Sequence, residues 1–322
     1  MTDAGGRAHD VAQGAQGAPG AHGERHELAL FAGTMAVIAW SFGAILVRSV
    51  GVSTPTVVFW RLWMAQPVMI GAAYLTGGRI SRQVLSDSLV PGMLFAFSMM
   101  TGFASFKNTS IANATLIGAL QPAVMLLVAP SLFGTRSSVR QRVLTGVAFV
   151  GTAVLVLAAG ASSGARWQGD AFAVANLAIW TVYFIRVKQT RDRGVHAASF
   201  LASIFLIAAC TATPWALLTS DDLMSVDRTG YVWLLLMVIG PGLIGHGSMT
   251  WAQRHLDITV ASLLTLLSPV LSTMLAWMIF DERLNGTQLV GAVVVVVALA
   301  GIMAEFRESA PEPLDQVSVA ND

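Results

Sequence analysis

Ten long apolar runs follow one another through the middle of this sequence. A hydrocarbon core about 30 Å thick needs roughly 20 apolar residues at a helical rise of 1.5 Å. Inside lipid every backbone polar group must be paired within its own segment, so such runs are helices, whereas a barrel would show shorter alternating strands. We therefore predict an all-α integral membrane protein with ten transmembrane helices, near 28–47, 56–75, 89–106, 111–133, 143–161, 171–187, 198–218, 231–251, 258–280 and 289–304.

Composition points the same way and excludes several other classes of protein. Of the 322 residues, 55% are hydrophobic and 11% are charged, against roughly 25% charged residues in soluble domains. The net charge of +1 is spread over short connections, which argues against nucleic-acid binding. Cys210 is the only cysteine, which excludes an internal disulfide and a cysteine-based metal cluster. We expect no cofactor and no bound metal.

The distribution of Lys and Arg predicts the orientation of the chain. With the N-terminus inside, thirteen of the 19 basic residues lie on the cytoplasmic side and five in outer loops, with Arg61 inside a span. The positive-inside rule then favours two cytoplasmic termini, in a multi-pass protein of the cell inner membrane. The polar stretches 1–27 and 308–322 are expected to be disordered cytoplasmic tails, and the first is too polar for a signal peptide.

Spaced matches between the two parts of the chain indicate an internal duplication. A shift of 147 residues pairs Pro122 with Pro269, and a shift of 140 pairs Trp40-Ser41 with Trp180-Thr181. Five is an odd number, so a second five-helix copy enters the membrane in the opposite direction. We therefore predict inverted repeats, 28–165 and 166–307, whose pseudo-symmetry permits alternating access around a midplane site.

Several residues in these repeats resemble one known family. They are Trp40-Ser41, Arg61, Pro122, Gly169-Asp170, Trp180 and the segment GLIGHGSMTWAQRHLDITVASLLTLLSPVLSTMLAWMIFDERLNGTQLVGAVV. The chain resembles the drug/metabolite transporter superfamily, specifically EamA-type ten-helix carriers, over 28–304, and is similar to YddG-type amino-acid exporters. The resemblance implies export of a small metabolite, with aromatic or apolar amino acids as the expected solutes. Because Gly134-Thr135 replace Asp281-Glu282 in the first repeat, an acidic helix end is expected in the second repeat alone.

The two repeat-related prolines mark one candidate site. Pro122 and Pro269 fall near the centres of spans, where proline removes a helical hydrogen bond and kinks the helix. The freed carbonyls face a cavity in one interpretation, and neighbouring helices satisfy them in the other. Small polar residues flank both prolines and serve either substrate contact or helix packing: Ser262, Thr265, Ser268 and Ser272 in one span, and Thr115, Gly118 and Gln121 in the other.

A second set of candidates carries aromatic and titratable side chains. Asn176, Trp180 and Tyr183 share one face of a helix and would line a pocket or form an aromatic packing seam. His246 lies within a span between Gly245 and Gly247, and either contacts substrate or forms a hydrogen bond between helices. Arg61 would attract a carboxylate at the outer mouth, or extend its guanidinium to water. Trp40, Ser98 and Trp251 complete the candidate substrate-binding residues.

The spans contain no obvious central carboxylate, and sodium sites and many proton relays use one. We therefore expect export or exchange of a small-molecule substrate rather than ion-driven uptake. Drug or amine export, and a receptor or scaffold in the bilayer, remain alternatives, while an enzyme lacks paired acids or a phosphate loop. The fifth and tenth spans are nearly pure Val, Leu, Ala and Gly, and are expected to be peripheral supports or a homodimer contact.

Overall fold

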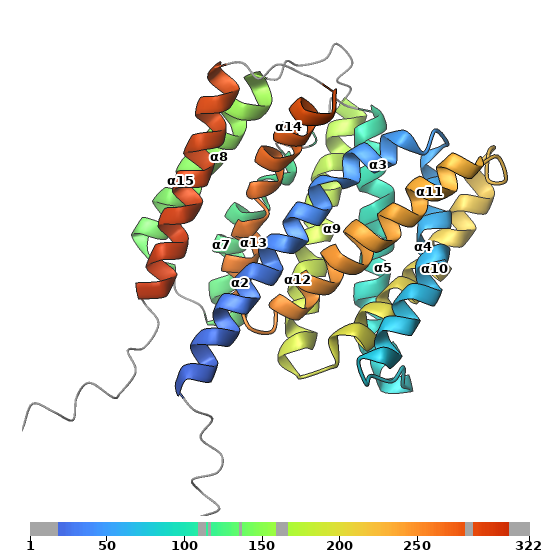
Figure 1. Cartoon of the computed structure of the whole chain (residues 1–322), viewed down its shortest axis with the longest axis horizontal. Coiled ribbons are helices and arrows are strands. Elements are labelled where there is room, and N and C mark those ends of the chain that lie inside the picture. The colour runs from blue at the N-terminus through green and yellow to red at the C-terminus, as the bar shows by residue number, and fades with distance from the viewer. Residues whose placement is uncertain are drawn as a thin grey trace, which may run out of the picture.

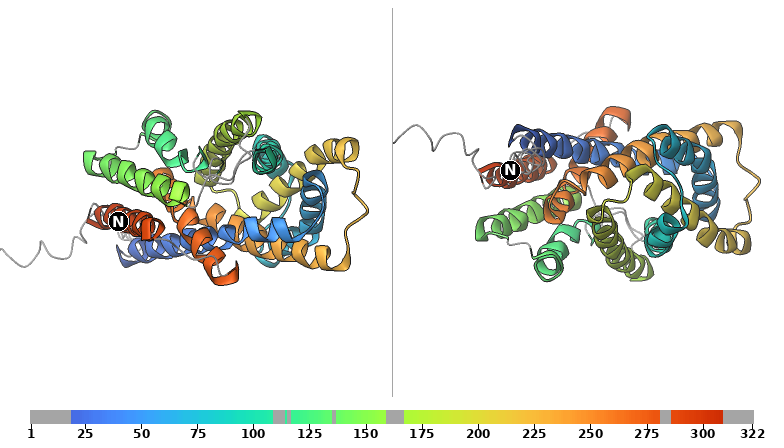
Figure 2. Two further views of the ribbon diagram at one scale, coloured as in Figure 1. Left: turned by 90° about the horizontal axis from the view of Figure 1, so that it is seen from above. Right: turned by 90° about the horizontal axis from the view of Figure 1, so that it is seen from below.

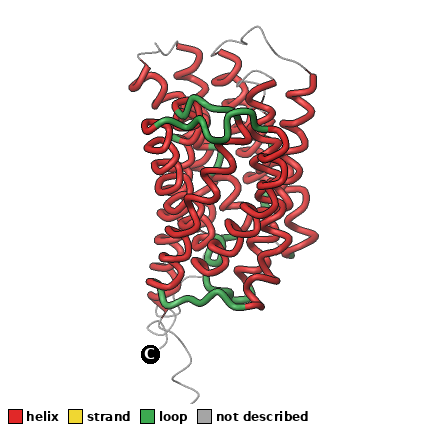
Figure 3. Tube along the Cα trace, turned by 90° about the vertical axis from the view of Figure 1, so that its right-hand side faces the viewer, coloured by secondary structure: helices red, strands yellow, loops and turns green. Residues whose placement is uncertain are grey.

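The structure, a computed structural model, describes residues 19–108, 114, 117–134, 137–158, 167–280 and 286–308. All regular secondary structure in these ranges is helical, which confirms the predicted all-α class there. Figure 3 shows helices side by side, with most described loops at the two ends of the bundle. The helices are α2 Pro19–Ser41, α3 Gly43–Ser49, α4 Thr54–Leu75, α5 Arg82–Asn108, α7 Gln121–Phe133, α8 Val139–Ala158, α9 Trp167–Asp192, α10 Ala197–Thr219, α11 Arg228–Met237, η1 Val238–His246, α12 Gly247–Ala252, α13 Ile258–Leu264, α14 Leu267–Phe280 and α15 Gly286–Glu308.

Within the described residues, four helical segments combine the length and apolar composition needed to cross a membrane. They are Arg82–Ser105, Trp167–Asp192, Ala197–Thr219 and Arg228–Ala252. Three shorter apolar helical segments lie at other predicted spans: Gln121–Phe133, Ile258–Leu271 and Gly286–Ile302. Helix α2 begins at Pro19, inside the stretch expected to be a disordered tail, so the expectation was wrong for residues 19–27. Proline is favoured at the start of a helix, and this one continues directly into the apolar run.

Two predicted spans are interrupted helices, and the two repeat-related prolines sit just after the interruptions. Helix α13 ends at Leu264 and α14 begins at Leu267, so Pro269 lies in the first turn of α14. Pro122 is the second residue of α7. In a first turn the backbone N–H has no helical partner, so proline costs no hydrogen bond there. Each span is therefore interrupted just before its proline, and the proline lies in the first turn of the helix that follows.

The first and eighth spans also depart from a regular helix. The first breaks at Phe42, between α2 and α3. Ser41 Oγ donates to the Val37 carbonyl oxygen at 2.8 Å, a back-bond that bends helices. In the eighth span, the residues from Val238 to His246 form a π-helix that contains Pro241. Proline cannot donate to the helical ladder, and π segments occur frequently at functional sites.

The helices that pack together come mainly from opposite predicted halves of the chain. Helices α8 and α15 lie side by side at one end of the molecule (Figure 1), and Figure 2 shows this pair far from α4 and α10. Helix α4 packs on α10, α7 on α13, and α5 on α9 and α10, while α2 packs on η1. The interior is therefore formed between the two halves of the sequence rather than within each.

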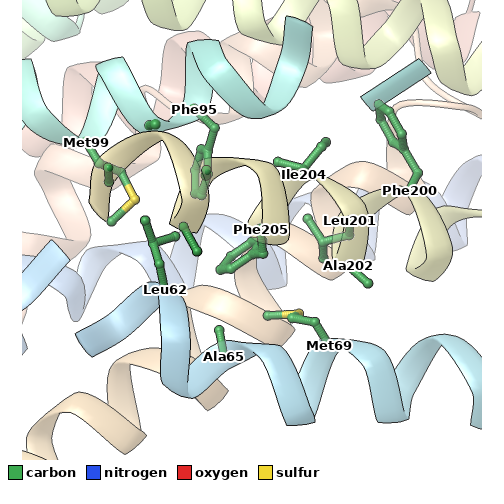
Figure 4. Packing of buried hydrophobic residues seen from close by; sticks show 14 of the residues in the cluster. Leu62, Ala65, Met69, Phe95, Met99, Phe200, Leu201, Ala202, Ile204 and Phe205 are labelled. Atoms are coloured by element: carbon green, nitrogen blue, oxygen red, sulfur yellow. The ribbon is translucent and has the colours of Figure 1, made fainter. Parts of the chain in front are cut away.

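The largest buried cluster joins α4, α5, α9 and α10. Figure 4 shows Phe95 of α5, Ile204 and Phe205 of α10, and Leu62 and Met69 of α4 close together. All five side chains are at most 1% exposed, and burying each is worth roughly 1.5–3 kcal/mol. This packing fixes the helices against which the candidate site is built.

Candidate functional site

His246 is surrounded by aromatic rings from four other helices. Its ring centroid lies 5.1 Å from that of Trp40 on α2 and 4.9 Å from that of Phe95 on α5. The Trp180 ring of α9 lies 6.1 Å away and the Phe205 ring of α10 lies 5.9 Å away. These separations are typical of offset and edge-to-face aromatic contacts. The sequence predicted three of these five residues, and the structure brings them together.

The close approach of Trp40 to η1 depends on Gly245. A Cβ atom added at Gly245 would lie 2.6 Å from Trp40 Nε1 and 2.7 Å from its Cδ1, so a larger residue would push the indole away. Trp180 packs on Tyr183 one helical turn further along α9, with ring centroids 4.9 Å apart. Helices α2, η1 and α9 thus place one wall of rings around the histidine.

A small cavity lies beside this aromatic cluster. Its lining residues are Trp40, Trp180, Tyr183, Phe184, His246, Met249, Thr250 and Gln253. The cavity volume is about 10 Å³, which is room for roughly one water molecule. A solute as large as an amino acid does not fit in this cavity as it stands.

Two hydrogen-bond donors on this lining have no partner. Trp40 Nε1 and Gln253 Nε2 are buried and make no hydrogen bond. An indole N–H can only donate, and a buried polar atom without a partner costs roughly 1–3 kcal/mol. The cavity therefore offers unused donors to a ligand that carries acceptor oxygens.

Arg61 of α4 adds positive charge next to this cluster. The residue is 7% exposed, its Nε has no partner, and its guanidinium interacts electrostatically with His246. Among the described residues no Asp or Glu lies within 4.0 Å of it. A largely buried guanidinium is costly unless it is paired or reaches water.

Several predicted residues pair with one another away from the cavity. Ser98 Oγ donates to Asn176 Oδ1 at 2.8 Å, across the α5–α9 contact. Thr265 Oγ1 donates to Gln121 Oε1 at 3.4 Å, so the two interrupted spans meet, and Gln121 Nε2 is buried without a partner. These contacts favour helix packing for Ser98 and Asn176, and leave one unused donor at Gln121.

The remaining predicted residues lie near this second contact or outside it. Ser41 Oγ donates to Ser268 Oγ at 3.4 Å, and Ser262 Oγ donates to the Thr259 carbonyl oxygen at 2.8 Å. Trp251 stacks on His255 with ring centroids 4.5 Å apart and does not line the cavity. Gly118 has no neighbour within 4 Å of an added Cβ, while Thr115 and the Ser272 side chain lie outside what the structure describes.

Sequence reasoning missed six residues of the cluster and its cavity lining: Phe95, Phe184, Phe205, Met249, Thr250 and Gln253. One signal was available. The shift of 150 residues that pairs Pro91 with Pro241 also pairs Ala96 with His246, which places Phe95 beside the histidine's counterpart. Phe205 had no such signal, because an apolar residue in an apolar span is indistinguishable from the rest of the core.

Comparison with known proteins assigns this arrangement to a family. The EamA-like transporter family matches residues 27–157 and again residues 167–304. An uncharacterized transporter of Archaeoglobus fulgidus is 21% identical over 268 residues, which cover 82% of this chain and 91% of that protein. The pseudopaline exporter CntI of Pseudomonas aeruginosa is 23% identical over 267 residues, with 82% and 92% covered.

The fold is shared with a protein of known structure. That crystal structure superposes with a TM-score of 0.75 at 21% sequence identity, over 87% of this chain and 98% of the other. One assignment agrees with three observations: helices apolar enough to cross a bilayer, an aromatic cavity between the halves, and two family matches that span most of the sequence. This chain is therefore a membrane-embedded, multi-pass member of the EamA-like transporter family.

Proposed function

We propose that this transporter exports or exchanges a small organic metabolite, with apolar or aromatic amino acids as its main solutes. The observation that carries the proposal is the small cavity beside His246, which lies between helices of both halves and is lined by Trp40, Trp180 and Tyr183. Flat rings and apolar surface recognise an apolar side chain. Closure on both sides of a solute is what alternating access requires.

The packing of the helices supports two inverted five-helix repeats. In the predicted repeats, α2 corresponds to α9 and α5 to η1, and the contact between α2 and η1 is matched by the contact between α9 and α5. The pairs α4–α10, α7–α13 and α8–α15 each join two corresponding helices. A two-fold axis generates such reciprocal contacts. The two interrupted spans also meet through Gln121 and Thr265. Ten spans, with cytoplasmic termini in the inner membrane, are part of this proposal.

Export is favoured over ion-driven uptake by the interior charges and by one relative. No Asp or Glu of the described chain is among the buried residues, and coupling sites for sodium or protons commonly use such a carboxylate. The similar protein of Pseudomonas aeruginosa is named as an exporter of pseudopaline. Export of a metabolite by this chain is consistent with both.

Flux measurements test the proposal directly. Purified protein in liposomes loaded with labelled amino acids, nucleobases or amines should release apolar or aromatic amino acids faster than protein-free liposomes. The Trp180→Ala variant should lose most of this flux, because the residue walls the cavity. Equal release with and without protein for the whole panel would contradict the proposal and favour a receptor or scaffold.

Drug or amine export is the second candidate, and the same aromatic walls support it. Tryptophan and tyrosine faces bind ammonium groups through cation–π contacts, worth about 2 kcal/mol when desolvated. Release of labelled amines, without release of amino acids, would select this candidate.

A further inference from the structure

We propose that the cavity recognises its solute through a carboxylate, and that a free amine contributes no binding. The proposal rests on the transport function above and defines the chemical class of its solute. A carboxylate presents acceptor oxygens and a negative charge. The unpaired donors and buried cations around the cavity fit both properties.

The lining itself supplies the hydrogen bonds. Trp40 and Gln253 both line the same small cavity, and neither Trp40 Nε1 nor Gln253 Nε2 makes a hydrogen bond with any residue that the structure describes. Thr250, between them on the lining, is 3% exposed. The Trp40 indole can only donate, so a ligand that satisfies it must bring an acceptor. A carboxylate has two such oxygens and an ammonium has none.

Two buried arginines approach the cavity from different helices. Arg61 interacts electrostatically with the lining residue His246. Arg191 of α9 is 3% exposed and donates from Nε to the carbonyl oxygen of the lining residue Thr250 at 2.9 Å, while one of its terminal nitrogens has no partner. Neither arginine is within 4.0 Å of an acidic group among the described residues. Positive charge therefore exceeds negative charge around the cavity.

An ammonium group finds no matching charge on the described lining. The eight lining residues contain no Asp or Glu, and no described Asp or Glu is buried as a whole residue, although Glu305 Oε2 is a buried atom. Aromatic faces remain as partners for a cation, but the two arginines oppose it by like-charge repulsion. We therefore expect removal of an amine to leave binding intact, and removal of a carboxylate to abolish it.

Three small molecules that share a phenyl group separate these contributions. L-phenylalanine carries both charged groups, 3-phenylpropionate only the carboxylate, and phenethylamine only the amine. Binding to the purified full-length protein is measured by equilibrium dialysis of each labelled compound. We expect 3-phenylpropionate to bind within about threefold of phenylalanine, and phenethylamine at least roughly tenfold more weakly, since hydrogen bonds to charged groups carry that difference.

Variants assign the preference to the named groups. Trp40→Phe keeps a ring and removes the N–H, and Arg61→Gln removes the charge. Each should reduce the ratio of acid to amine affinity roughly tenfold. Arg61→Lys, which keeps the positive charge, should retain most of the preference for the acid over the amine. Arg186→Gln is the matched control, because Arg186 is an exposed arginine of α9. An affinity ratio is independent of the folded fraction of each preparation.

Each outcome decides the proposal. Phenethylamine binding as tightly as 3-phenylpropionate, absence of 3-phenylpropionate binding, or an unchanged ratio in both Trp40→Phe and Arg61→Gln would overturn it. Flux of phenylalanine in liposomes reports separately on the transport function. If phenylalanine is transported but binding requires the amine, only the carboxylate inference is wrong. If binding requires the carboxylate but phenylalanine is not transported, only the transport function is wrong.

Discussion

At the scale of single residues, the site combines close ring packing with unused polar groups. Phe95 and Phe205 hold one side of His246, and Trp40 and Trp180 hold the other. Rings in van der Waals contact leave room for roughly one water. The donors of Trp40 and Gln253 stay unpaired in this state.

Gly245→Ala tests the contact between Trp40 and η1. The new methyl group would lie 2.6 Å from Trp40 Nε1, so the indole must move out of the cavity wall. We expect release of labelled phenylalanine from liposomes to fall at least tenfold, with membrane expression unchanged. Gly240→Ala in the same π-helix is the control, because no atom lies within 4 Å of its added Cβ. Equal loss in both variants would indicate a general effect on the helix.

His246→Ala tests the centre of the aromatic cluster. Four rings lose their shared partner, and the residue lines the cavity. We expect transport to be lost while the amount of protein in the membrane is unchanged. His26→Ala, near the start of α2, should transport as the wild type does. Unchanged transport by His246→Ala would rule out a functional role for this histidine.

At the scale of helices, most positions were predictable and the interruptions were not. Hydrophobic length and composition placed α4, α5, α9 and α10 within a few residues of their observed positions, because apolar length is a local property of the sequence. The breaks at Phe42 and after Leu264 lie close to a contact between Ser41 and Ser268. Those contacts form between distant segments, so no local pattern reports them.

The residues around His246 show the same limit of sequence-based prediction for the candidate site. Trp180 and Tyr183 were predicted to share a helix face, and both line the cavity. Asn176 was predicted on the same face, yet it pairs with Ser98 on α5 instead. A helical period orders residues around one helix. It cannot say which neighbouring helix each part of that face will meet.

Helix α4 is capped at its N-terminus by a residue far along the chain. The Ser53 backbone N–H donates to Asp222 at 2.6 Å, and the hydroxyls of Ser53 and Thr56 donate to the same carboxylate at 2.5 Å each. Burial alone would raise the pKa of Asp222, but these hydrogen bonds outweigh it and lower the pKa to about 2. The contact joins two loops that the predicted topology places on the outer face.

Asp222→Asn should therefore destabilise the protein, because a neutral amide makes weaker hydrogen bonds than the carboxylate that accepts from Ser53 and Thr56. The carboxyl pKa is lower folded than unfolded, so the stabilisation is present above pH about 4 and is lost as the pH falls towards 2. Thermal unfolding in detergent should show a lower midpoint for Asp222→Asn at pH 7, and a smaller difference from wild type near pH 3. Asp221→Asn, an exposed neighbour, is the control. Identical midpoints for all three proteins would contradict the capping role.

At the scale of the whole molecule, orientation in the membrane is open to a labelling experiment. Cys210 is exposed, so it is first replaced by serine. In that background, Ser225→Cys lies in a predicted outer loop and Gln83→Cys at a predicted cytoplasmic helix start, and both positions are exposed. A membrane-impermeant maleimide should label Ser225→Cys in intact cells and Gln83→Cys only after lysis. The reverse pattern would invert the proposed topology.

The proposed inverted repeats predict a carrier that alternates between two openings rather than a pore. A carrier of this kind moves labelled solute faster when the opposite side already holds solute, because each return step is then loaded. The measurement is uptake of labelled phenylalanine into proteoliposomes, with and without unlabelled phenylalanine inside. The proposed mechanism predicts faster initial uptake with internal solute, and loss of this stimulation in His246→Ala. Equal initial rates with and without internal solute, in a protein that transports phenylalanine, would contradict alternating access.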